Sequence, residues 1–187
     1  MPKRSFDPYT ILGALERNYV DYVVIGGVAR VLRGTDEITT GLDVCPSFSP
    51  DNLVRLGQAV AELRTPHGRA VAITDETISA ELPLTLSTVA GELKIIGTPA
   101  GAPRGFVDLR RAATKEHLAQ GLRPLVASAA DLARRLAALD REGDRPRLTE
   151  LRRIIELEVN REHTLGQPPA TPAPPRRRQP PSRKLTR

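Results

Sequence analysis

A pair of glycines and a single aspartate are the residues of this 187-residue chain best placed to do chemistry. Gly26 and Gly27 follow a β-branched run at 20–25 and precede a short helix expected at 28–33. Adjacent glycines let the backbone approach a ligand closely, and the free N–H groups at the start of the helix would point toward that space. The pattern therefore favours a phosphate cradle, with an ordinary tight turn as the alternative.

Asp43 lies on the next expected strand, at 42–44, after Gly34 and the pair Thr39 and Thr40. Because successive side chains of a strand alternate between its two faces, positions 41, 43 and 45 share one side. We therefore expect the carboxylate of Asp43 to face the glycine turn.

The order of these pieces resembles the nucleotidyltransferase fold, and in particular the bacterial toxins of the AbiEii or MenT type. That family has a GG or GS turn on a helix and then two aspartates one residue apart on the next strand. This chain reads Gly41-Leu42-Asp43, so a glycine stands where the first aspartate is expected. The family's basic fold has a third carboxylate on a later strand, where this chain has Lys94. Glu92, on the same face as Lys94, is a candidate for the missing acid, with an ordinary salt-bridged strand face as the alternative.

A second resemblance lies on a later helix. The family carries K-L-x-A-L with a downstream arginine and aspartate, and residues 135–139 here read RLAAL, followed by Arg141 and Asp144. Arginine in place of lysine keeps the charge but not the geometry of an ammonium. The resemblance implies catalytic roles for Asp43, Lys94, Arg135 and Asp144, with solvated surface charges as the alternative. The nucleotide-binding residues it implies are Gly26, Gly27, Arg30, Thr39 and Thr40, with Mg²⁺ held by Asp43.

The resemblance implies transfer of a nucleoside monophosphate from a nucleoside triphosphate to an acceptor hydroxyl, with pyrophosphate leaving. In the toxin branch the acceptor is an RNA, the 3′ end of tRNA, and a cognate antitoxin opposes the toxin. Mg²⁺ commonly uses one or two carboxylates plus substrate phosphates, so Asp43 alone is a conceivable ligand. A regulatory hypothesis follows from family behaviour: phosphorylation of Thr39 or Thr40 would place negative charge where the triphosphate must lie.

Four interpretations stay open at this point. The first is a transferase with an altered metal site, and the second is a non-catalytic relative that binds a nucleotide, an RNA or a partner protein. The third is an inactivated copy, because a single base change converts aspartate to glycine. The fourth is an RNA-binding α/β domain with a basic tail and no relation to transferases.

The pattern of expected elements favours an α/β (α+β) fold, a nucleotidyltransferase-like mixed sheet backed by helices with a C-terminal helical part. Asp7, Ser49 and Ser128 are expected helix N-caps, two of them followed by proline. Further strands are expected at 70–73, 84–89 and 92–96, helices at 106–120 and 148–163, and a short strand or extended connection at 122–127. We divide the chain into a core at 1–125, C-terminal helices at 126–165 and a disordered Pro/Arg-rich tail at 166–187.

Composition narrows the classes of function. The net charge of +6 comes from residues 166–187, which hold six basic residues and no acidic ones, so the tail is a candidate RNA-binding arm or a solubilising tail. Aromatic residues make up only 3%, which argues against base-stacking platforms. The single cysteine excludes an intramolecular disulfide and a Cys-rich zinc site. No apolar run is long enough for a membrane span, and no signal-peptide core follows the N-terminus, so we expect a cytoplasmic protein.

Overall fold

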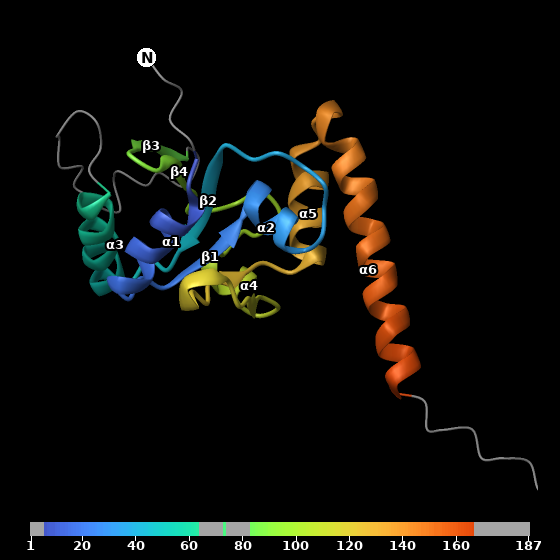
Figure 1. The fold of residues 1–187 in the computed structure, drawn as a ribbon. Coiled ribbons are helices and arrows are strands. Elements are labelled where there is room, and N and C mark those ends of the chain that lie inside the picture. Colours follow the sequence, from blue (N-terminus) through green and yellow to red (C-terminus); the bar gives the residue numbers. More distant parts are fainter. Residues whose placement is uncertain (1–5, 64–72, 74–82, 167–187) are drawn as a thin grey trace, which may run out of the picture.

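The computed structural model describes residues 6–63, 73 and 83–166, and it contains a mixed six-stranded sheet with the strand order β3-β4-β2-β1-β6-β5 (Figure 1). Strands β1 and β2 are antiparallel, β2 and β4 are parallel, β1 and β6 are parallel, and both edge strands are antiparallel to their neighbours. The strands are β1 (Tyr22–Ile25), β2 (Gly41–Pro46), β3 (Leu84–Thr88), β4 (Gly91–Ile95), β5 (Thr114–Lys115) and β6 (Leu125–Val126). A mixed sheet backed by helices confirms the expected fold class.

The helices that accompany the sheet begin with α1 (Pro8–Arg17), α2 (Gly26–Leu32) and α3 (Pro50–Glu62). They continue with α4 (Phe106–Leu109), α5 (Ala129–Leu139) and α6 (Arg145–Gly166), and with two short 3₁₀ turns at Ala119–Gly121 and Glu142–Asp144. Asp7 caps α1 by accepting hydrogen bonds from two backbone N–H groups, and Ser128 caps α5 by accepting one from Asp131. Both caps agree with the sequence. Ser49 is the N-cap of α3, and its side chain makes no capping hydrogen bond.

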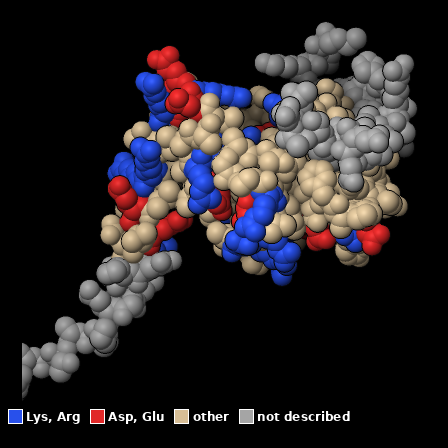
Figure 2. All heavy atoms as spheres, turned by 180° about the vertical axis from the view of Figure 1, so that it is seen from behind, with Lys and Arg blue, Asp and Glu red and all other residues tan. Residues whose placement is uncertain are grey.

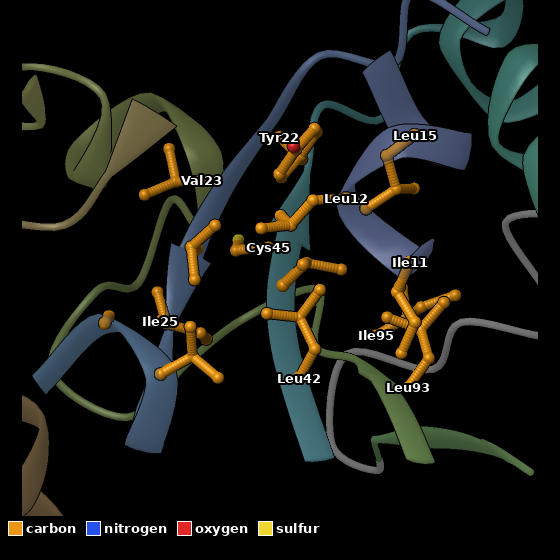
Figure 3. Close-up of a cluster of buried hydrophobic side chains, with 14 of the residues drawn as sticks. Ile11, Leu12, Leu15, Tyr22, Val23, Ile25, Leu42, Cys45, Leu93 and Ile95 are labelled. Carbon is orange, nitrogen blue, oxygen red and sulfur yellow. The ribbon is translucent and has the colours of Figure 1, made fainter. Parts of the chain in front are cut away.

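One hydrophobic core lies between α1 and the central strands. Ile11, Leu12 and Leu15 of α1 point toward Leu42 of β2 and Leu93 of β4 (Figure 3). All four residues of β1 are buried, because helices cover the sheet on both sides. Aliphatic side chains therefore provide nearly all of the packing, as the scarcity of aromatic residues predicts.

Alternation along β2 and β4 separates this core from a polar face. Leu42, Leu93 and Ile95 are fully buried in the core, so the intervening Asp43 and Lys94 project from the opposite face of the sheet. The register pairs Asp43 with Ile25 of β1 on one side and with Lys94 of β4 on the other. The end of β1, where α2 begins, therefore lies directly beside the aspartate.

The C-terminal helices extend the fold along one edge of the sheet. Helix α5 packs on α2, and α6 packs on α5 and runs beyond the rest of the body (Figure 1). Leu132 and Leu136 of α5 and Leu151 of α6 belong to the same hydrophobic cluster as α1 and the strands. Helix α6 spans a longer range than the expected 148–163. None of the helices in the described residues is long and apolar enough to cross a membrane.

The helix expected at 106–120 is wrong. Helix α4 ends at Leu109, and Thr114 and Lys115 form strand β5, which pairs with β6. The guanidinium of Arg33 holds this segment, because it donates hydrogen bonds to Thr114 and Glu116 and to the carbonyl oxygens of residues 126 and 127. These long-range contacts override a weak helical pattern. The strand expected at 70–73, apart from residue 73, and the tail at 167–187 lie outside the described residues.

Candidate functional site

A polar pocket of about 210 Å³ lies where α2, the loop after it and the ends of β2 and β4 meet. Its lining residues are Gly27, Arg30, Glu37, Ile38, Thr39, Thr40, Gly41, Asp43, Glu92, Lys94 and Arg147. Most of them carry charged or polar side chains. The pocket therefore contains most of the residues that the sequence marks as candidates, although they come from four separate segments.

Asp43 lies against the glycine turn, as the alternation along its strand predicts. Gly26 adopts a positive φ of 72°, and a Cβ atom at this position would come within 2.2 Å of the Asp43 Oδ2 atom. Only glycine fits, because of both the backbone angle and the carboxylate. The Asp43 carboxylate therefore lies beside the first residue of α2, a helix of seven residues whose N-terminus has no side-chain capping hydrogen bond. The phosphate cradle expected at the helix N–H groups stays a prediction, and Gly27 lines the pocket.

Three cations influence the carboxylate of Asp43. The Arg135 Nη2 atom, from α5, lies 3.8 Å from Asp43 Oδ2, and Lys94 and Arg30 contribute further positive potential. Burial, together with the charge of Glu92, nevertheless raises the pKa of Asp43 above its ordinary value. The side chain retains 21% of its exposure. Asp43 is thus a partly desolvated carboxylate whose ion pair is too long for a hydrogen bond.

Of the four cations Arg30, Lys94, Arg135 and Arg147, Arg135 has the longest ion pair in the described part of the chain, 3.8 Å to Asp43. Its Nε atom is buried and has no hydrogen-bond partner in the described part of the chain. Burial lowers the pKa of the guanidinium, and Asp43 opposes that effect. Arg135 does not line the pocket, but it lies beside Asp43, which does. A buried guanidinium donor without an acceptor is costly, so this side chain favours an additional oxygen acceptor near Asp43.

Glu92 and Lys94 form an ion pair on β4, with Lys94 Nζ 2.8 Å from Glu92 Oε1. The hydrogen bond and charge of Glu92, with help from Asp43, raise the pKa of Lys94. Glu92 is the register partner of Gly41 on the neighbouring strand. A Cβ atom at position 41 would lie 3.0 Å from the Glu92 carbonyl oxygen and 3.1 Å from its Cβ atom. A side chain at position 41 would therefore require β4 to shift slightly.

Glu37 and Arg147 are residues of the pocket that the sequence did not reveal. Arg30 binds Glu37 with two hydrogen bonds, of 2.6 and 2.9 Å, and Arg147 Nε lies 3.0 Å from the same carboxylate. Burial opposes ionisation of Glu37, but Arg30, Thr35 and Arg147 together outweigh it and lower its pKa. Arg147 follows Glu37 by 110 positions, so no local motif could have signalled the pairing.

The other sequence candidates take different places. Thr39 and Thr40 line the pocket, and the Thr39 hydroxyl donates a hydrogen bond to the carbonyl oxygen of Gly41. Asp144 does not line the pocket, but its Oδ1 atom lies 3.0 Å from the Nη1 atom of Arg147, which does. Cys45 shares the face of Asp43, but burial raises the pKa of its thiol to about 12, which removes it as a nucleophile near neutral pH.

The donor set of the pocket does not fit a resident Mg²⁺ ion. Each of its carboxylates already lies within 3.8 Å of a cation of the chain: Glu37, Asp43 and Glu92 in the lining and Asp144 behind it. No group of three or more Asp, Glu, His or Cys side chains able to hold a metal ion is found within residues 6–63, 73 and 83–166. Mg²⁺ binds through oxygen ligands that are free to coordinate it. Cations of the chain bind Glu37, Glu92 and Asp144 at 3.0 Å or less, and the Asp43 carboxylate lies 3.8 Å from the Arg135 guanidinium.

The surface around the described body carries charges of both signs. On the face shown in Figure 2, Lys and Arg side chains lie among Asp and Glu side chains. Nucleic-acid binding through phosphates alone needs a concentration of positive charge. On this face the charges alternate, so any RNA contact here would depend on individual side chains.

No family model matches the sequence, and no curated protein matches it either. Among solved structures the chain is similar to the crystal structure of a "putative nucleotidyltransferase" from Thermotoga maritima. The two are 15% identical with a TM-score of 0.47, and the match covers 84% of this chain and 89% of that one. At this identity the similarity is one of backbone fold and does not extend to individual residues.

Proposed function

We propose that this chain is a nucleotidyltransferase-like protein that binds a nucleoside triphosphate by its phosphates in the pocket around Asp43. The observation that carries the proposal is the guanidinium of Arg135, which lies beside Asp43 and holds a buried Nε donor with no acceptor in the described residues. Phosphate oxygens are strong acceptors for such donors.

The size and lining of the pocket support a phosphate ligand. A volume of about 210 Å³ lies below the range of roughly 300–1,000 Å³ that suits a whole drug-sized molecule. Arg30 and Arg147 share the single carboxylate of Glu37, and each guanidinium carries five N–H donors. Donors therefore remain that carboxylate oxygens cannot all satisfy.

A binding measurement tests this proposal. We expect a fluorescent nucleoside triphosphate to bind the wild type, and Arg135→Gln to weaken binding about tenfold, the effect of losing one charge-assisted hydrogen bond. Arg134→Gln is the matched control, because Arg134 is its exposed neighbour and pairs with Asp131 outside the pocket. Equal affinity of the two variants would contradict the proposal, as would no binding by the wild type.

A second candidate function is turnover: transfer of a nucleoside monophosphate to an RNA hydroxyl, such as the 3′ end of tRNA, by a toxin that an antitoxin opposes. The position of Asp43 against Gly26 favours it, because the aspartate on the strand and the glycine turn are the parts of the family pattern that meet in space. Catalysis with Mg²⁺ would first require Asp43 or Glu92 to give up its present cation.

Incubation with Mg²⁺, each labelled triphosphate and total tRNA separates binding from turnover. Labelled RNA from the wild type, lost in Asp43→Ala, supports a transferase. Label from Gly41→Asp alone supports an inactivated copy, although this side chain must displace the backbone at Glu92. Binding without label from either protein leaves the non-catalytic interpretation.

A further inference from the structure

We infer that the Lys94 ammonium serves as a built-in cation of this pocket, in place of a divalent metal ion, so that polyphosphate binding is independent of metal. The inference rests on the proposed function for its ligand. The inference starts from the observation that the carboxylates of the pocket lie beside cations of the chain and therefore do not fit a resident Mg²⁺ ion.

Lys94 lies between two carboxylates of the β2–β4 pairing and forms its ion pair with one of them, Glu92. It is the direct register partner of Asp43, and its Nζ atom lies 2.8 Å from Glu92 Oε1. Glu92 in turn is the register partner of Gly41. The two carboxylates on this face thus come from neighbouring strands: Lys94 binds Glu92 and adds positive potential at Asp43, whose own ion pair is with Arg135.

The balance of charges in the pocket supports a role for Lys94 in place of a metal ion. The pocket and the residues directly bound to it contain the cations Arg30, Lys94, Arg135 and Arg147 and the carboxylates Glu37, Asp43, Glu92 and Asp144. Equal numbers of the two signs leave no net negative charge for a divalent ion to neutralise. Two unit charges about 4 Å apart repel by about 4 kcal/mol at an effective dielectric constant of 20, so a metal ion beside the ammonium would be disfavoured.

Removal of the ammonium is expected to create a metal site. In Lys94→Gln, Glu92 loses the cation that it binds and Asp43 loses nearby positive potential. Both carboxylates then become more available as oxygen ligands, which suit Mn²⁺ as well as Mg²⁺. The Lys94 side chain is 40% exposed, so the substitution leaves the core intact. Lys115→Gln is the matched control, because Lys115 is exposed on β5 and does not line this pocket.

The experiment measures Mn²⁺ binding by electron paramagnetic resonance, without nucleotide, on the full chain and its variants. We expect Lys94→Gln to bind Mn²⁺ at least about tenfold more tightly than the wild type and Lys115→Gln. Adding Asp43→Asn to Lys94→Gln should abolish the gain. Equal Mn²⁺ affinity of the wild type and Lys94→Gln would overturn the inference, and so would a gain that survives Asp43→Asn.

A second arm measures the affinity for a fluorescent nucleoside triphosphate with Mg²⁺ and with EDTA. We expect EDTA to leave the affinity of the wild type unchanged and to weaken binding by Lys94→Gln. Loss of wild-type binding in EDTA would overturn the inference while leaving the proposed function standing. Absence of nucleotide binding under every condition would overturn the proposed function, and the Mn²⁺ arm would then decide the inference by itself.

Discussion

Two carboxylates of the same pocket, Glu37 and Asp43, are held in opposite ways. Glu37 receives two hydrogen bonds from Arg30 and a third contact from Arg147, and its pKa is lowered. Asp43 has a single cation at 3.8 Å, and its pKa is raised. The difference indicates that Glu37 stabilises the fold, whereas Asp43 is kept available for a ligand at some cost in stability.

The origin of the partners explains the contrast. Glu37 is bound by Arg30 of the neighbouring helix α2, and its pair with Arg147 connects the loop after α2 to the first turn of α6, 110 positions further along the chain. Asp43 sits on the central strand β2, where neighbouring backbone and Gly26 fix its position without a tight ion pair. Strained or poorly compensated groups of this kind are typical of ligand sites.

The largest effect is expected from removing Glu37. Glu37→Ala leaves two guanidinium groups around an unfilled buried space, and loss of one partner of a buried pair costs about 3 kcal/mol. Asp43→Asn should change the free energy of unfolding by about 1 kcal/mol or less, because a neutral side chain escapes the desolvation penalty. Urea unfolding measures both.

Glu156→Ala is a control for the first variant, because Glu156 is exposed on α6 and its loss should cost less than about 0.5 kcal/mol. If Asp43→Asn destabilised the protein as much as Glu37→Ala, the contrast between the two carboxylates would be wrong.

A smaller effect is expected at the glycine turn. Gly26→Ala places a side chain at a positive φ and against Asp43, so we expect a loss of about 2 kcal/mol. Gly57→Ala is the matched control: Gly57 lies within α3 with open space around it, and alanine there should stabilise the protein by about 0.5–1 kcal/mol. In a double-mutant cycle, Asp43→Ala should relieve part of the Gly26→Ala cost, and strict additivity would exclude the contact.

The smallest effect concerns pH. The lowered pKa of Glu37 gives a stabilisation that is present above its unfolded value of 4.5 and is lost as the pH falls through the folded value. The raised pKa of Asp43 acts in the opposite sense: the folded state holds the proton more tightly, so stability decreases as the pH rises from 3.8 through the folded value.

Urea unfolding of the wild type, Glu37→Gln and Asp43→Asn between pH 3 and 7 checks these signs. Relative to the wild type, Asp43→Asn should gain stability as the pH rises, whereas Glu37→Gln should lose it. The same trend in both variants would contradict the assignment.

Several strands and helix caps were predictable from the sequence because they depend on residues that are close together in the chain. The β-branched run before Gly26 forms β1, Asp7 and Ser128 cap helices, and alternation along β2 brings Asp43 to the glycine turn. These features depend on backbone geometry and on neighbours a few residues away. The helix expected at 106–120 failed for the converse reason, because Arg33 fixes that segment from a distance of more than 80 residues in the sequence.

The sequence by itself determined a mixed sheet backed by helices and the chemical types of the residues at the end of its central strands. The pair of Lys94 with Glu92 follows from their shared strand face. Only the tertiary structure decided the other pairs: Arg135 beside Asp43, and Arg30 with Arg147 on Glu37. The physical reason is that a strand pattern specifies which face a side chain takes. The cations that reach Asp43 and Glu37 from distant parts of the chain, Arg135 and Arg147, depend on how helices α5 and α6 fold back onto the sheet.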